Sequence, residues 1–116
     1  METNHAVDAL AALAQETRLT AFRLLVEAGP EGIAAGEIAR TLDVPPPNLS
    51  FHLSALVHAG LVTSRRDGRQ VIYAADFDAM DTLVGFLAQN CCRGEGGCLP
   101  SLERTGCAPK ARAGKA

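Results

Sequence analysis

The sequence predicts a mostly α-helical domain that carries one small β-hairpin. Apolar residues recur at intervals of three and four along much of the first 90 residues, which is the period of an α-helix. Between residues 61 and 74 the pattern changes to a period of two, interrupted by Asp67-Gly68, a strong signal for a hairpin turn. With 116 residues and no internal repeat, the chain is expected to form one modest core.

Three helices are predicted ahead of the proline run at residues 45–47. An alanine-rich helix runs from Ala6 to Leu13, a second from Glu16 to Ala28 ends at Gly29-Pro30, and a short third runs from Ala34 to Leu42. Helical spacing indicates which of their side chains face inward. These are Leu19, Phe22, Leu25, Val26, Ile38, Ala39 and Leu42.

A fourth helix lies between a proline run and Gly60. Proline is tolerated in the first helical turn, where its missing N–H does no harm, and glycine commonly follows a helix end. The buried stripe is predicted to be Leu49, Leu53, Leu56 and Val57. The opposite face is predicted to carry Asn48, Ser50, His52 and His58. Short donors and acceptors opposite an apolar stripe suit a helix that enters the major groove of DNA.

The third and fourth helices, joined by a short turn through Asp43-Val44, form a helix-turn-helix. The strands expected after it are Leu61 to Arg66 and Arg69 to Ala74, which makes the hairpin the wing of a winged helix-turn-helix. Its basic tip is suited to contact phosphates, although a solvated hairpin edge would look the same. The expected DNA-binding residues are Pro47, Asn48, Ser50, His52, Arg65, Arg66, Arg69 and Gln70.

The net charge of −2 argues against a nucleic-acid binder, because such domains are usually basic. That objection weakens if the charges are segregated. The wing arginines cluster within a few residues, whereas the acidic residues are spread along the chain, and a dimer would present the basic cluster twice.

A last helix is predicted from Phe77 to Asn90, capped by Asp76. Its apolar face consists of Phe77, Met80, Leu83, Val84 and Leu87. Together with the first helix, this is more apolar surface than a small domain can cover, so we expect a homodimer with half-sites about 34–36 Å apart. A monomeric bundle is the alternative.

All four cysteines lie in the last quarter of the chain: Cys91, Cys92, Cys98 and Cys107. No apolar run is long enough for a membrane span and no signal peptide is evident, so we expect a cytoplasmic protein with reduced thiols. The glycines between Cys92 and Cys98 allow the chain to fold back and bring three sulfurs together. Trivalent arsenic or antimony takes three sulfurs, whereas Zn²⁺ usually takes four ligands, which Cys107 would complete. Two alternatives stay open: the three cysteines could form a redox switch, or the neighbouring Cys91 and Cys92 could bind no ligand.

From Ala11 to Ala88 the chain resembles the ArsR/SmtB family of bacterial metal-responsive repressors. The residues that carry the resemblance are Glu16-Thr-Arg-Leu19, Gly36-Glu-Ile-Ala39, Leu49-Ser-Phe-His-Leu53, Ala59-Gly-Leu-Val62 and the Asp67-Gly68 wing. The resemblance implies a homodimer that represses its operon and leaves DNA when an inducer binds. The cysteines that some arsenic sensors carry on the third helix are replaced here by Ala34, Gly36 and Ala39, and the last helix has no His. Cys91, Cys92 and Cys98 resemble the site of another arsenite-responsive subgroup.

We therefore expect a winged helix-turn-helix DNA-binding and dimerisation domain at 1–90, a metalloid-binding segment at 91–107 and a disordered basic tail at 108–116. The protein would repress an arsenic-resistance operon by binding operator double-stranded DNA as a dimer, with no cofactor. As(III) or Sb(III) bound to Cys91, Cys92 and Cys98 would release it. The alternatives are a thiol-redox-sensing or Cd/Zn-sensing repressor, or a small thiol enzyme, which the lack of a Cys-x-x-Cys motif disfavours.

Overall fold

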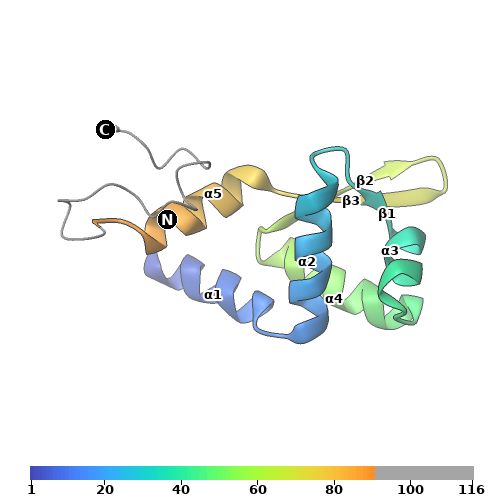
Figure 1. The fold of residues 1–116 in the computed structure, drawn as a ribbon, viewed down its shortest axis with the longest axis horizontal. Coiled ribbons are helices and arrows are strands. Elements are labelled where there is room, and N and C mark those ends of the chain that lie inside the picture. Colours follow the sequence, from blue (N-terminus) through green and yellow to red (C-terminus); the bar gives the residue numbers. More distant parts are fainter. Residues whose placement is uncertain (91–116) are drawn as a thin grey trace. The chain divides into compact units, whose positions relative to one another are not determined.

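The structure is a computed structural model that describes residues 1–90 (Figure 1). One unit runs from Glu2 to Ala79, and a second contains Met1 and resumes at Met80. The described helices are α1 (Thr3–Leu13), α2 (Glu16–Ala28), α3 (Ala35–Leu42), α4 (Pro46–His58) and α5 (Phe77–Leu87). The strands are β1 (Ile33–Ala34), β2 (Val62–Asp67) and β3 (Gln70–Ala75). A mostly helical fold with one small antiparallel sheet confirms the predicted fold class. Within residues 1–90 no helix is both long and apolar enough to span a membrane.

The ends of the helices follow from local capping. α2 has the predicted bounds, and the Gln15 side chain caps it by accepting a hydrogen bond from the Arg18 N–H at 2.9 Å. Asp76 caps α5 as predicted, since its Oδ1 accepts from the Ala79 N–H at 3.0 Å. The prediction for the end of α5 is wrong by three residues, because the helix stops at Leu87 and Asn90 adopts a positive φ of 60°.

The sheet has the order β1-β3-β2, with both pairs antiparallel. The sequence did not predict β1, because two residues carry no alternation. Ile33 and Ala34 pair with Tyr73 and Ile72, which is why α3 begins one residue later than predicted. In this way β1 joins the wing to the start of the helix-turn-helix.

The hairpin turn is one residue further along than Asp67-Gly68. Asp67 pairs with Gln70, so the two loop residues are Gly68 and Arg69. Gly68 takes the first position with a φ of 66°, and Arg69 is not among the described residues with positive φ. Glycine first, followed by a residue with negative φ, is the pattern of a type II′ turn, whose twist matches that of the flanking strands. The shift places Arg69 at the tip of the wing.

The core of the Glu2–Ala79 unit is built from α2, α3, α4 and the sheet. Its buried apolar residues include Phe22, Leu25, Ile38, Leu49, Leu53, Leu56, Leu61 and Ile72. The prediction of burial is wrong for two residues: Leu19 is 44% exposed and Val57 is 36% exposed. Each lies at the margin of its helix stripe, since one residue turns an α-helix by about 100°.

Apolar side chains remain exposed on both helices that the sequence assigns to a dimer interface. On α1, Val7 is 57% and Leu10 is 41% exposed. On α5, Leu83 is buried but Leu87 is 60% exposed. Each of these two helices therefore has apolar surface that remains available to a second chain.

Candidate nucleic-acid interface

The turn of the helix-turn-helix depends on a left-handed residue at Asp43. Its φ and ψ are 56° and 49°, and the following Val44 N–H donates to the Ala39 carbonyl oxygen at 3.1 Å. This backbone arrangement closes many helices, and aspartate is one of the few residues other than glycine that adopts it readily. The chain therefore changes direction within three residues, and α4 packs against α3.

The first turn of α4 has few backbone donors. Pro45 is the N-cap residue, Pro46 and Pro47 begin the helix, and the Leu49 N–H makes the first helical bond, to the Pro45 carbonyl at 3.0 Å. Proline has no N–H, so Asn48 alone offers one among the first three helical residues. The row of N–H groups that binds phosphate at many helix N-termini is therefore missing here. Side chains elsewhere must supply most of the phosphate contacts.

The side chains of α4 do not all lie where the sequence placed them. Relative to the buried stripe of Leu49, Leu53 and Leu56, a turn of about 100° per residue puts Phe51 and His58 on the opposite face. Asn48 and His52 lie on one flank, and Ser50 lies on the other. The earlier expectation that Asn48, Ser50 and His52 share the opposite face is therefore wrong in detail. The centre of that face holds an aromatic ring, that of Phe51, which is 66% exposed.

A side chain from α2 holds this part of α4 in place. The Arg18 Nε donates to the His52 Nδ1 at 3.2 Å, and the Arg18 guanidinium carbon lies 5.5 Å from the centre of the Phe51 ring. The Phe51 and His52 rings meet edge to face, with centres 5.6 Å apart. Because Nδ1 accepts this bond, neutral His52 carries its proton on Nε2 and presents a donor there. Half-buried His52 is thus both a candidate base contact and part of the support of α4.

The two faces of the wing have different surroundings. Arg65 lies opposite Ile72, and its Nη2 donates to the Glu31 carbonyl oxygen at 2.8 Å. Arg66 lies opposite Val71 and therefore points to the other face of the hairpin. Val71 and Tyr73 of that face line a hollow of about 180 Å³ together with residues of α3 and α4. Arg66 thus shares the side of the wing that is turned toward the helix-turn-helix.

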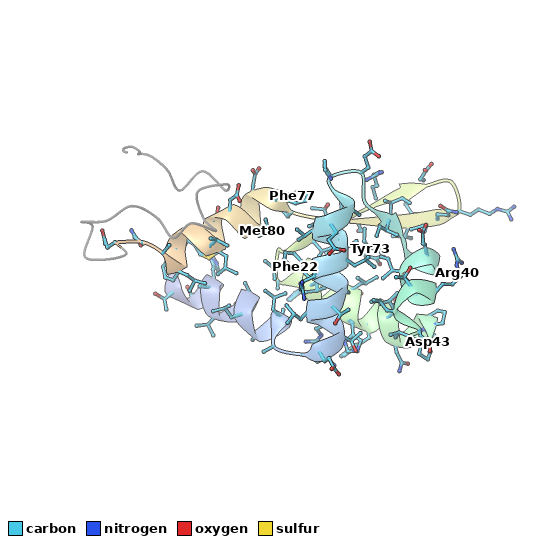
Figure 2. All side chains as sticks on the ribbon, in the orientation of Figure 1. Phe22, Arg40, Asp43, Tyr73, Phe77 and Met80 are labelled. Atoms are coloured by element: carbon cyan, nitrogen blue, oxygen red, sulfur yellow. The ribbon has the colours of Figure 1, made fainter. Side chains whose placement is uncertain are left out.

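The remaining predicted DNA-binding residues are exposed and lie on α4 or the wing: Pro47, Asn48, Ser50, Arg69 and Gln70. The sequence analysis did not assign Arg18, Phe51 or Arg40 to DNA binding. Arg40 is exposed on α3, and Figure 2 shows its side chain extending away from that helix. Residues 1–90 contain six arginines and eleven acidic residues, and four of the six arginines lie on α3 or the wing.

The predicted metalloid ligands Cys91, Cys92 and Cys98 lie outside the described residues, as do the predicted tail and Cys107. Within residues 1–90 no group of three or more His, Cys, Asp or Glu side chains is placed to hold a metal ion.

The second helix of the helix-turn-helix, α4, and strand β3 of the basic hairpin line the same hollow. This arrangement defines a winged-helix DNA-binding protein. Comparison with known proteins agrees: a helix-turn-helix domain family matches residues 13–65. Over 77 residues the chain is 34% identical to the uncharacterised HTH-type transcriptional regulator YceK of Bacillus subtilis, which covers 66% of this chain and 76% of YceK. The chain belongs to the ArsR family of transcriptional regulators.

Two further similarities bear on function. The chain is 46% identical over 63 residues to ArsR of Halobacterium salinarum, named as a candidate repressor of an arsenical resistance operon. The match covers 54% of this chain and 48% of that relative, so the chain spans about half the length of the halobacterial protein. The homodimeric winged helix-turn-helix domain Mb0332 of Mycobacterium bovis has a TM-score of 0.59 and 27% identity, and the match covers 79% of this chain and 85% of that domain.

Proposed function

We propose that this protein is a homodimeric repressor of an arsenic-resistance operon that leaves its operator when trivalent arsenic or antimony binds Cys91, Cys92 and Cys98. The observation that carries the proposal is the 46% identity to the halobacterial arsenical-resistance repressor, combined with the α4 and wing geometry of a DNA reader. The apolar surface on α1 and α5 and the homodimeric mycobacterial neighbour support the dimer.

The chemistry of the proposed donor set fits a thiophilic inducer. Thiolates are soft ligands that favour such ions over hard cations. Trivalent arsenic has a lone pair and takes three sulfurs, which is the number that Cys91, Cys92 and Cys98 supply. Zn²⁺ would need a fourth ligand to complete a tetrahedron. In this proposal arsenite is the signal that the protein detects, and DNA binding itself needs no cofactor.

Position in the chain provides the link from inducer to DNA. Cys91 follows the end of α5 by four residues. If α5 lies in the dimer interface, an ion that draws the three sulfurs together changes the end of that helix and, through it, the separation of the two α4 helices. A coupling of about 1–3 kcal/mol, or 5–150-fold in DNA affinity, is typical of such linkage and is enough for induction.

The test measures DNA affinity by fluorescence anisotropy, with the duplex upstream of the protein's own gene as probe and the protein kept reduced. Arsenite is expected to weaken wild-type binding by about 5–150-fold. Cys91→Ser, Cys92→Ser and Cys98→Ser should each bind the duplex normally and lose most of this response. Cys107→Ser is the matched control and should respond like the wild type. A wild type that stays bound in saturating arsenite contradicts the proposal.

Two further treatments separate the alternatives. Peroxide that releases the DNA, with recovery on adding a thiol reductant, would instead support a redox sensor. Release by Cd²⁺ that requires Cys107, without release by arsenite, would support a four-thiolate metal sensor. An X-ray absorption count of three sulfurs around bound arsenic is the result expected from our proposal.

A further inference from the structure

Phe51 is an unusual residue for the exposed face of a DNA-reading helix. At 66% it is the most exposed large apolar side chain of residues 1–90. It follows Leu49 by two positions, so it lies nearly opposite the stripe that anchors α4 in the core. Single exposed apolar residues are common on proteins, so exposure alone assigns no role. Two contacts around the ring make this one different.

The Phe51 ring is held by its neighbours although it faces solvent. The Arg18 guanidinium lies within cation–π range of the ring, and His52 meets it edge to face. Arg18 is in turn tied to His52 through its Nε. A ring fixed in this way loses little side-chain entropy when it binds a partner, which favours its use as a contact residue.

The chemistry of the major groove indicates what such a ring contacts. Base edges there present donors and acceptors, and one apolar group, the C5-methyl of thymine. Asn48 and Ser50, on the two flanks of the same helix, suit the polar edges. Phenylalanine is one of the side chains that make apolar contact with the thymine methyl.

We propose that Phe51 is a specificity-determining residue that contacts the C5-methyl group of a thymine in each half-site, and that Arg18 and His52 are its positioning residues. This proposal rests on the DNA binding proposed above but is independent of the inducer. It assigns the apolar ring a partner that the polar residues of α4 cannot recognise.

A second surface competes for the same ring. Phe51 also lines a hollow between α1 and α4, together with Ala12, Ser54 and His58. A protein chain could occupy that hollow, with Phe51 as an apolar anchor. We favour DNA because α4 is the second helix of the helix-turn-helix, and the face opposite its buried stripe is the one that such helices turn toward bases.

The experiment uses the purified full-length protein to select duplexes from a random-sequence library, and the consensus duplex becomes the probe. Each thymine is then replaced singly by deoxyuridine, which removes the C5-methyl and keeps the base-pairing edge. Wild-type affinity is expected to fall by about fourfold at one thymine in each half-site, the effect of exposing about one methyl group. The same replacement should leave the affinity of Phe51→Ala unchanged.

The controls separate a lost contact from a damaged fold. Val57→Ala removes another partly exposed apolar side chain of α4 and should keep the full deoxyuridine effect. Arg18→Gln should reduce the effect while the melting temperature and the dimer, checked by calorimetry and gel filtration, stay intact. If Phe51→Ala does not fold, Phe51→Gln takes its place with the same expected insensitivity.

Three results overturn the proposal. The selected consensus could lack thymine, the wild type could be insensitive to every deoxyuridine, or Phe51→Ala could keep the wild-type sensitivity. A Phe51→Ala protein that changes its oligomeric state and retains the deoxyuridine effect would assign the ring to a protein interface. Failure to select any duplex would instead remove the DNA-binding function itself, so the two failures can be told apart.

Discussion

Replacing Arg66 and Arg69 together with alanine is expected to weaken operator binding by about 4,000-fold in 0.1 M salt, if the two proteins bind equally at 1 M salt. A dimer would lose four phosphate contacts, and each contact contributes about 0.9 to the slope of log affinity against log salt. The slope should therefore become shallower by about 3.6. These two arginines matter most because α4 begins with prolines and its first turn has little backbone N–H with which to hold phosphate.

The measurement is a salt titration of DNA affinity for the wild type and the double variant. Arg23→Ala is the matched control, since it removes an exposed arginine that belongs to α2 and not to the wing. It should leave the slope nearly unchanged. Arg65→Ala should change the slope less than the loss of Arg66 or of Arg69 alone, because the Arg65 guanidinium already donates to the Glu31 carbonyl oxygen. An unchanged slope in the double variant would mean that the wing does not touch the DNA backbone.

Local patterns were sufficient for most of the fold. The bounds of α2 follow from its periodicity and from Gly29, and the opening of α4 follows from the proline run. The failure to predict β1 and the one-residue error in the hairpin turn have a common cause. Strand β1 and the turn are both set by pairing with β3, which no pattern within two or three residues reveals.

The candidate site was predicted unevenly for the same reason. Residues of the wing and α4 could be named because their elements were recognisable in the sequence. Phe51 could also have been found, by placing each residue of α4 around a helix and asking what lies opposite Leu49, Leu53 and Leu56. Arg18 could not, because it reaches His52 across 34 residues of chain. Contacts between distant segments depend on tertiary packing and leave no periodic signal.

Among the glycines near the wing, Gly32 is the one at which an added methyl group should destabilise the fold most. Its φ is +81°, a region that costs other residues about 1–2 kcal/mol. A Cβ there would also overlap the Tyr73 carbonyl oxygen and lie 3.0 Å from the Ile72 Cγ2, so β1 would have to separate from β3. We expect Gly32→Ala to lower the free energy of unfolding by about 3–5 kcal/mol.

Gly29→Ala provides the matched control for this prediction. Gly29 has a similar φ of +87°, but nothing lies within 4 Å of the position that its Cβ would take. Its ψ of −174° places Gly29 in a backbone region that is almost restricted to glycine, so Gly29→Ala should show only this backbone cost, about 1–3 kcal/mol. Urea unfolding at one fixed protomer concentration compares the two variants, since the stability of a dimer depends on concentration. Equal losses in both would show that the close approach of β1 to β3 contributes little. A larger loss in Gly32→Ala, with DNA binding weakened in the folded fraction, would show that this contact holds the wing beside α4.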